Sequence, residues 1–399
     1  MDNNGVELRV CSAKLQGFHP FPTWNGTISA PLKNNQKLCS ILTADGELVV
    51  LQTFQNDDEI ELSANCLRVV KILPPTNEKF LSFCQCWAND GSVVVTAHNN
   101  YVVFYSSDNF HVLRRVKLCY GVISLDIVKV QTVETKLDDT KFLLLVGTAF
   151  GAFLYTILLD RKSDGVDGTS DLTLTPVARV HDGVAVCMVK FSSDGYTAAI
   201  GTMDGRLFLR RLDSHSHDTL AIFGTAALSR VLQAPRITGL SFSVCSMKLV
   251  VATRKGNVYV FTCASKAEQW QSLPSCFNLN ANLKPKARGA LGTNKTPAST
   301  VQTLVSCWGP VFVVCSRTHA SRLEMYDFVS GSLLHSLQLA PAKPVSSAAL
   351  CQWVDQPLVT GICSMQINDN GRSRLLCQDS SANIAVVEWP FLDALNGSR

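Results

Sequence analysis

One short turn, flanked by apolar strand-like segments, recurs along this chain at nearly constant spacing. Its clearest copy runs from Thr202 to Gly205 and ends in the dipeptide Asp204-Gly205. Asp-Gly favours a tight β-hairpin, because glycine adopts positive φ without a Cβ clash. The residues on either side, Tyr196–Ile200 and Arg206–Leu209, are largely apolar. This segment therefore predicts a strand, a turn and a second strand.

Related turns occur upstream and downstream of this copy. They begin at Thr43, Thr96, Thr148 and Thr253 and end at Gly46, Asn99, Gly151 and Gly256. From Thr43 onwards, the first residues of successive copies lie 53, 52, 54 and 51 positions apart. Asn99 fits the pattern because asparagine also tolerates a left-handed backbone. Two weaker copies follow near Ser316 and Asp379, each after a step of 63 residues.

Each repeat carries more than one hairpin. A second turn signal, again Asp-Gly, stands at Asp90-Gly91 and Asp194-Gly195, ahead of two of the turns above. Each unit thus accounts for three strands and leaves room for a fourth. Short strands repeating every 50 residues or so are typical of a β-propeller, in which neighbouring blades cover the faces that one sheet cannot cover alone. We predict an all-β fold: a seven-bladed β-propeller of four-stranded antiparallel blades.

The spacing divides residues 1–399 into the blades of one propeller domain. The expected blades are roughly 1–70, 71–120, 121–180, 181–235, 236–299, 300–343 and 344–399. We expect the ring to close by pairing of Val6–Val10 with Ile384–Glu388, because such pairing removes an exposed sheet edge. Between blades 4 and 5, the segment Ala226–Leu232 is compatible with a short helix.

The pattern resembles the WD40-repeat superfamily over most of the chain, and most closely in the fourth unit. In that family a His, a Ser or Thr, an Asp and a Trp share hydrogen bonds within one repeat. The resemblance implies that His181, Thr202 and Asp204 take three of these roles, whereas the Trp position falls near Arg210. The Trp-Asp dipeptide that ends the family's repeats is absent, and Glu388-Trp389 comes nearest to it.

The composition is typical of a globular protein and limits the kinds of partner that we expect the chain to bind. Hydrophobic residues make up 46% of the chain and charged residues 17%, which supplies ample core material. A net charge of +4 is too mild to indicate nucleic acid binding. Fifteen cysteines without a CxxC pair favour free thiols in a reducing compartment over disulfides or a zinc site. No secretory signal is visible, so we expect a cytoplasmic or nuclear protein without a metal or cofactor.

The segment from Phe142 to Leu159 contains no charged residue and imitates a membrane span. Its length alone would make it a candidate for a transmembrane helix. However, it contains the repeat turn from Thr148 to Gly151 and splits around that turn into two strand-length runs. We therefore predict a blade that is buried on both faces rather than a membrane span.

The longest irregular stretch is the predicted loop 264–300. It holds five Lys or Arg residues against one Glu, an excess equal to the net charge of the whole chain. A loop this long in a compact domain is usually functional or disordered. It is either a solvated insertion or a basic arm that docks an acidic partner. In the second case the candidate partner-binding residues are Trp270, Lys284, Lys286 and Arg288.

The motifs that would indicate an enzyme are missing from the sequence: it has no Walker loop, no strand-linked GxGxxG, no HExxH and no GxSxG. The leading hypothesis is a non-catalytic scaffold, or a subunit of a multiprotein complex, that binds other proteins through propeller loops. After loop 264–300, the second candidate surface is the face bearing the turns at Asp45, His98, Asp204 and Lys255. The alternatives are a trafficking or coat-type propeller at a membrane surface and a hydrolase with a channel-centred site.

Overall fold

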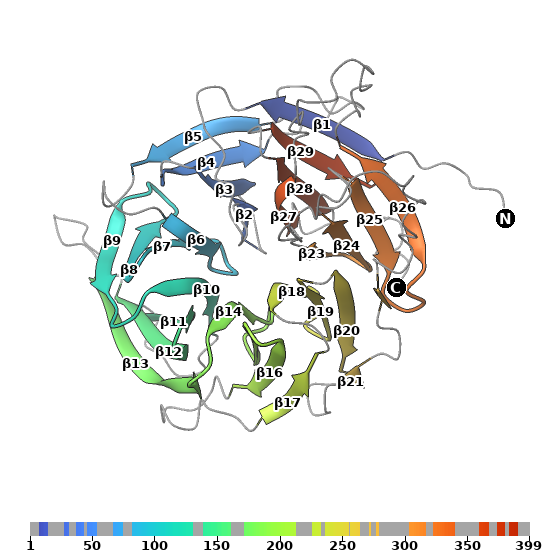
Figure 1. Cartoon of the computed structure of the whole chain (residues 1–399). Helices are drawn as coiled ribbons and strands as arrows, with labels where there is room; N and C mark the ends of the chain where they lie inside the picture. Colours follow the sequence, from blue (N-terminus) through green and yellow to red (C-terminus); the bar gives the residue numbers. More distant parts are fainter. Residues whose placement is uncertain are drawn as a thin grey trace, which may run out of the picture.

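The computed structural model is a ring of small antiparallel β-sheets around a central axis (Figure 1). It describes residues 8–14, 28–31, 37–43, 46–53, 67–74, 82–130, 139–160, 171–212, 226–232, 236–254, 256–263, 271–272, 277–278, 303–316, 322–339, 359–366, 373–379 and 383–389. The secondary structure of these residues is entirely β-strand, in seven sheets. The predicted all-β, seven-bladed propeller is confirmed. The assignment of all 399 residues to a single domain stays a prediction.

Within blades 1 to 6 the strands follow one another in chain order from the central axis outwards. Blade 1 contains β2 (Ile28–Ser29), β3 (Leu38–Leu42), β4 (Leu48–Thr53) and β5 (Leu67–Leu73). Blade 2 contains β6 (Ser82–Trp87), β7 (Val93–His98), β8 (Tyr101–Ser106) and β9 (Val112–Lys117). Blade 3 contains β10 (Val122–Lys129), β11 (Asp139–Thr148), β12 (Gly151–Asp160) and β13 (Asp171–Asp182). Blade 4 contains β14 (Val186–Phe191), β15 (Thr197–Thr202), β16 (Arg206–Arg211) and β17 (Ala226–Val231).

Blade 5 departs from the four-strand pattern at its outer edge. Its first three strands are β18 (Ile237–Phe242), β19 (Lys248–Thr253) and β20 (Asn257–Thr262). The outer position is shared by two short strands, β21 (Gln271–Ser272) and β22 (Phe277–Asn278), which pair with opposite ends of β20. The prediction that 264–300 is a loop throughout is therefore wrong, because the open edge of β20 binds part of it. Blade 6 contains β23 (Thr303–Trp308), β24 (Val311–Ser316), β25 (Arg322–Asp327) and β26 (Leu333–Gln338).

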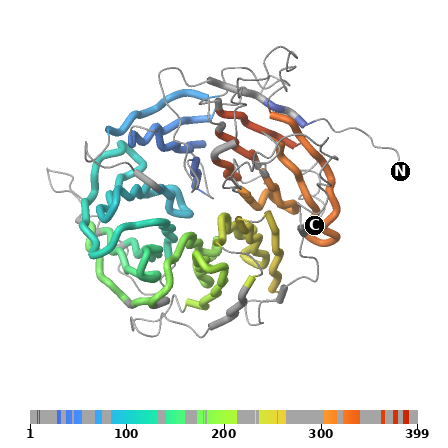
Figure 2. The backbone as a smooth tube through the Cα atoms, in the orientation of Figure 1, coloured from blue at the N-terminus to red at the C-terminus, as the bar shows by residue number. Residues whose placement is uncertain are grey.

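Blade 7 joins the two ends of the chain. Its inner strands are β27 (Val359–Gln366), β28 (Ser373–Asp379) and β29 (Asn383–Glu388), and its outer strand is β1 (Arg9–Lys14). The register runs from Arg9 opposite Glu388 to Lys14 opposite Asn383, and Figure 2 shows these first and last segments side by side. The expected closure is confirmed with a later N-terminal strand than Val6–Val10. Pairing the ends removes the sheet edge that an open ring would expose.

The core lies between the blades. An apolar cluster fills the junction between each pair of neighbouring sheets. Second strands such as β7 and β15 are buried at every position, whereas the outer strand β9 is exposed over most of its length. The packing is close enough to require glycine at Gly201, where a Cβ would lie 2.8 Å from Cγ2 of Ile237 in the next blade. Each Leu, Val or Phe buried in this way stabilises the fold by about 1.5–3 kcal/mol.

Of two local predictions, the one for Phe142–Leu159 is confirmed and the one for Ala226–Leu232 is wrong. Residues Phe142–Leu159 form the hairpin of β11 and β12, with Thr148 opposite Gly151, so the prediction of two strands is confirmed. The described residues contain no helix, and hence none long and apolar enough to cross a membrane. The short helix expected over Ala226–Leu232 is wrong. This segment is β17, because the outer edge of β16 offers backbone hydrogen bonds that outweigh a weak local helical preference.

Candidate functional site

The ring has two ends, which differ in the turns they carry. We call turn face the end with the connections between the second and third strands of each blade. We call belt face the end with the connections between the first and second strands. Thr202 and Gly205 belong to the turn face, and Asp194 and Gly195 belong to the belt face. The partner-binding candidates of the sequence, Trp270, Lys284, Lys286 and Arg288, lie outside the described residues.

On the turn face, a buried threonine closes the hairpin of several blades. In blade 4 the backbone N–H of Arg206 donates to the Thr202 hydroxyl at 2.9 Å, and Gly205 has a φ of +85°. The other turn threonines make equivalent bonds within their own hairpins: Thr43 with Glu47, Thr148 with Gly151 and Thr253 with Asn257, at 3.0–3.2 Å. The turn glycines have positive φ at Gly46 (+79°), Gly151 (+137°) and Gly256 (+81°). These turns are built by their own side chains.

Blade 2 departs from the alignment made on the sequence. Thr96 lies inside β7, paired with Gln85 and Val103, and not at the turn. The position equivalent to Thr202 is His98, which ends β7 and pairs with Tyr101 across the turn. Asn99 has a φ of +56°. The alignment is wrong by two residues because it followed the spacing of threonines, whereas the strand pairing places the equivalent position at His98.

The hydrogen-bonding group implied by the WD40 resemblance is only partly visible. The Thr202 hydroxyl donates to the Asp204 carboxylate, whose second oxygen lies 2.9 Å from Nε of Arg206. His181 lies near the end of β13, opposite Ala152, and its side chain is outside the described part of the structure. Arg210, at the Trp position, has a buried Nε without a hydrogen-bond partner. Asp204 is thus held by its own turn.

A cavity of about 220 Å³ runs along the axis and is lined by the innermost strand of every blade. The strand pairing identifies one equivalent residue on the innermost strand of each blade. This residue lies opposite the second-strand residue that comes three positions before the residue at the turn, which is Thr202 in blade 4. This ring consists of Ser29, Cys86, Asp126, Lys190, Ser241, Ser306 and Cys363. All seven line the cavity. We call this set the channel ring.

Two neighbouring members of the channel ring carry opposite charges. Nζ of Lys190 lies 2.8 Å from Oδ1 of Asp126, and the backbone N–H of Phe191 donates to Oδ2 of Asp126 at 2.7 Å. The Asp126 side chain is 5% exposed, whereas that of Lys190 keeps 43% of its surface accessible in the cavity. Burial opposes the charged ammonium, but the adjacent carboxylate outweighs this effect and raises the pKa of Lys190. The two groups therefore neutralise each other.

The thiols of the channel ring are poor nucleophiles. Burial raises the pKa of Cys363 to about 12 despite the opposing influence of Lys190, and it raises the pKa of Cys86 well above the ordinary value. Only the thiolate is nucleophilic, so these groups are inert near neutral pH. The cysteines in the described part of the chain are free, as expected from their spacing. No three His, Cys, Asp or Glu side chains among those residues gather into a metal-binding group.

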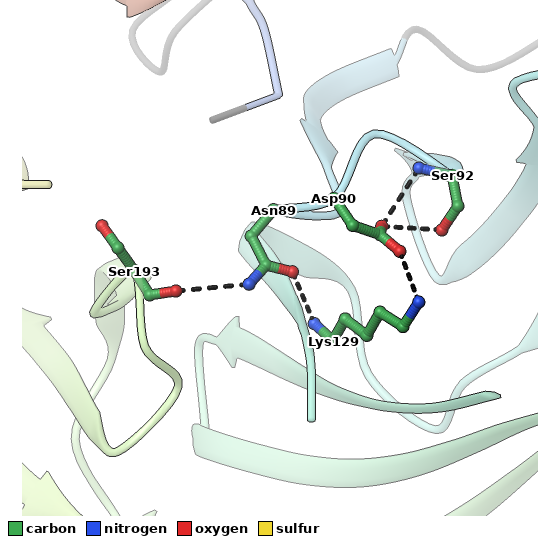
Figure 3. Close-up of polar contacts among 5 residues, drawn as sticks. All are labelled: Asn89, Asp90, Ser92, Lys129 and Ser193. Carbon is green, nitrogen blue, oxygen red and sulfur yellow. Dashed lines mark hydrogen bonds and ion pairs between the residues drawn. The ribbon is translucent and has the colours of Figure 1, made fainter. Parts of the chain in front are cut away.

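On the belt face, the turns bond to neighbouring blades (Figure 3). The Asn89 side chain of blade 2 accepts the backbone N–H of Lys129 in blade 3 at 2.8 Å and donates to the carbonyl of Ser193 in blade 4 at 3.2 Å. Asp90 accepts from Ser92 and pairs with Nζ of Lys129 at 3.0 Å. The contacts continue where Ser193 donates to the carbonyl of Ser243 in blade 5.

Comparison with solved structures agrees with this geometry. The chain matches the β-propeller domain of Cps50 (Swd1) from Myceliophteria thermophila with a TM-score of 0.56 and 11% identity, over 94% of this chain and 98% of that one. The chain has a seven-bladed β-propeller fold. A chain of the mitotic checkpoint complex also matches, with a TM-score of 0.55 and 13% identity, over 95% of this chain and 90% of that one. No family model matches the sequence, and the search of curated proteins found no match.

The propeller contains candidate functional residues that the sequence did not predict. Asp126 and Lys190 are 64 positions apart, and nothing local connects them. A charged residue inside an otherwise apolar strand was the available signal, because such a residue is rarely buried without a partner. The exposed aromatic group around Phe150 was also missed, since the surrounding apolar run was interpreted as core throughout.

Proposed function

We propose that this chain is a non-catalytic interaction scaffold, or a subunit of a multiprotein complex, that binds other proteins through its turn face. One observation carries the proposal: polar groups in the channel are paired with one another, whereas aromatic and cationic side chains project from the turn face. Asp126 is neutralised by Lys190, and the ring thiols stay protonated. Phe150, in contrast, is 55% exposed at the tip of a turn.

The rigidity of the ring supports the same proposal. Seven blades joined through apolar junctions, with the chain ends paired in β1 and β29, form a frame that holds its loops in fixed positions. Preorganised loops bind a partner without a large loss of conformational entropy. One of the solved structures with the same fold is a chain of the mitotic checkpoint complex, which is an assembly of proteins. We propose protein partners for this chain on the same grounds.

The experiment is size-exclusion analysis of the endogenous chain in a gentle lysate, followed by cross-linking mass spectrometry of its fractions. The chain has a mass of 43.5 kDa. We expect elution well above that mass and cross-links to partners near the turn face. Lys190→Met removes the ion pair to the buried Asp126 and should lower stability, but the folded variant should keep its partners, because the proposed contacts lie on the turn face. Elution as a monomer, or loss of a catalytic activity in Lys190→Met with the assembly unchanged, would overturn the proposal.

A further inference from the structure

A cluster of aromatic side chains, in which Phe150 is exposed and Tyr120 and Phe153 are half-buried, lies on the turn face where blades 2 and 3 meet. The ring centroids of Tyr120 and Phe150 are 4.9 Å apart, and those of Tyr120 and Phe153 are 5.4 Å apart. The guanidinium of Arg179 lies 5.4 Å from the centroid of Phe153. We call these four residues the Phe150 patch. Aromatic side chains and arginine are the residues that dominate binding energy at protein interfaces.

The backbone holds this patch in place. Thr148 anchors the turn, because its hydroxyl accepts the N–H of Phe150 at 3.1 Å. The carbonyl of Phe150 accepts the N–H of Gly183 at 3.4 Å and lies 3.5 Å from Nη2 of Arg179. The loop that carries Tyr120 is tied to the neighbouring turn by the N–H groups of Leu118 and Val122. The patch is therefore preorganised, which lowers the entropy lost on binding.

The fold does not require an aromatic residue at this turn. Blade 2 has Asn99 and Asn100 at the corresponding turn, blade 4 has Asp204, and blade 5 has Arg254. These residues are polar, as expected for a turn in contact with water. An exposed phenylalanine at the tip has no role in closing the hairpin, because Thr148 does that. Its exposed surface is best explained by a partner that covers it.

The charge around the patch indicates what kind of partner would bind. The cations described on the turn face of blades 2 to 5 are Lys117, Arg179, Arg206, Arg236 and Arg254. Asp204, a carboxylate among them, is paired with Arg206, and Asp182 ends β13 opposite Gly151. Arg236 and Arg254 are close enough for like-charge repulsion to contribute to the lowered pKa of Arg236, after burial. A surface with this charge attracts acidic segments.

We propose that the Phe150 patch binds an acidic segment of a partner protein, which places an aromatic or large apolar side chain against Tyr120 and Phe150 and a carboxylate beside Arg179. This inference rests on the proposed scaffold function and names the class of segment that its turn face binds. The apolar contact supplies most of the affinity, and the carboxylate supplies orientation and salt sensitivity.

The test is selection of phage-displayed random peptides on the full chain, with the double variant Phe150→Ala/Arg179→Glu for counter-selection. Peptides that pass should carry Asp or Glu next to an aromatic or large apolar residue. In fluorescence anisotropy, Phe150→Ala should weaken their binding about tenfold or more. Phe150→Leu should retain part of the affinity, and added salt should weaken binding. Thermal melting of each variant checks that the blade is folded.

A control variant and a footprinting experiment test whether peptide binding is specific to the Phe150 patch. Val329→Ala removes an apolar side chain that is 77% exposed in the belt-face turn between β25 and β26, and it should not change peptide binding. Bound peptide should slow alkylation of Cys119, the exposed neighbour of Tyr120, and leave that of the exposed Cys245 in a belt-face turn unchanged.

Three outcomes would overturn the assignment of the patch. The selected peptides could bind the double variant equally well, they could be basic, or selection could give no enrichment above the counter-selection. If the chain still elutes in an assembly under those outcomes, the scaffold function stands and only the surface is wrong. If the chain is monomeric in the lysate, the scaffold function itself fails, whatever the peptides show.

Discussion

The two faces of this propeller use their turns in different ways. On the belt face, side chains bond to the backbone of other blades: Asn89 of blade 2 contacts blades 3 and 4, and Ser193 of blade 4 contacts blade 5. On the turn face, the side chains of Thr148 and Thr202 bond within their own hairpins. On the belt face, side chains therefore join the blades. On the turn face, backbone bonds such as that from the N–H of Val122 to the carbonyl of Asn99 do so, and the outward side chains are free to vary.

This difference shows how one repeated unit can supply both a frame and a surface. A turn that closes itself through a buried threonine places few demands on its tip, so the tip can be Phe150, Asp204 or Arg254 without loss of the hairpin. A turn that bonds to another blade cannot change without disturbing that blade. Loops carried by a rigid scaffold are where binding residues concentrate. The comparison predicts that substitutions on the belt face reduce stability and that those on the turn face reduce binding.

The largest effect is expected for Glu388→Ala, at the belt-face end of blade 7. Glu388 pairs with Arg374, whose side chain is fully buried between β28 and β29. Removing the carboxylate breaks an ion pair to a buried charge, which typically destabilises a protein by about 3–5 kcal/mol. Urea unfolding followed by tryptophan fluorescence measures the loss, since Trp389 adjoins this pair. A loss below about 1 kcal/mol, as for an exposed pair, would show that the pair does not hold the closing blade.

The next effect compares two asparagines on opposite faces. Asn89→Ala removes a side chain that bonds to two other blades and leaves the half-buried N–H of Lys129 without this acceptor, so we expect a loss of about 1–3 kcal/mol. Asn100→Ala removes one bond, to the carbonyl of Leu118 in its own blade, with an expected loss of about 0.5–1.5 kcal/mol. Calorimetric unfolding of both variants provides the measurement. Equal losses would contradict the distinction between the faces.

Much of the fold was predictable because the repeat is local. The turn residues from Thr202 to Gly205 and the flanking apolar runs determine a hairpin by themselves, and repetition then implies a ring. Local signals failed where a partner decides the structure. Residues Ala226–Val231 are a strand because β16 offers an edge, and Gln271–Ser272 pair with β20 for the same reason. The sequence of each segment gives no information about the sheet edge with which it pairs.

The candidate surfaces were predictable only in part. The sequence drew attention to the face that carries Asp204 as a candidate surface, but Tyr120 and Phe150 become neighbours only when blades 2 and 3 pack together. The channel ring likewise depends on the register of seven sheets, which places Asp126 beside Lys190. The misalignment at Thr96 shows the limit of a spacing argument, because only the pairing of β7 with β6 and β8 identifies His98 as the equivalent position.

The rates at which cysteine thiols react allow both faces to be compared with the channel. Cys119 on the turn face and Cys245 on the belt face are exposed, whereas burial raises the pKa of Cys363 in the channel ring to about 12. Near pH 8 the channel thiol therefore has on the order of a thousandfold less thiolate than an ordinary cysteine. We expect iodoacetamide to modify Cys119 and Cys245 at least about tenfold faster than Cys363 in the folded protein. Peptide mapping by mass spectrometry gives the three rates, and comparable rates would show that the channel is open to reagent.

The same experiment separates the two exposed thiols. Sγ of Cys245 lies 3.2 Å from Oγ of Ser243, in a belt-face turn that is itself bonded to Ser193. We therefore expect Cys245 to react more slowly than Cys119, whose loop holds no such contact among the described bonds. The reverse order would mean that the belt-face turn of blade 5 opens more readily than the loop beside the Phe150 patch.

The smallest effect is expected for Asp204→Ala on the turn face. Asp204 and Arg206 pair at 2.9 Å, but their side chains are 40% and 49% exposed, so solvent screens the pair and its loss should change stability by less than about 1 kcal/mol. The hairpin should survive because Thr202 still bonds to the backbone of Arg206. The same substitution releases a cation on the turn face, so an acidic peptide selected on the Phe150 patch should bind at least as tightly as before. Urea unfolding measures the stability of this variant, and fluorescence anisotropy measures its peptide binding. A large loss of stability would show that the turn face contributes to the frame. Weaker peptide binding would contradict the proposed role of the positive charge on this face.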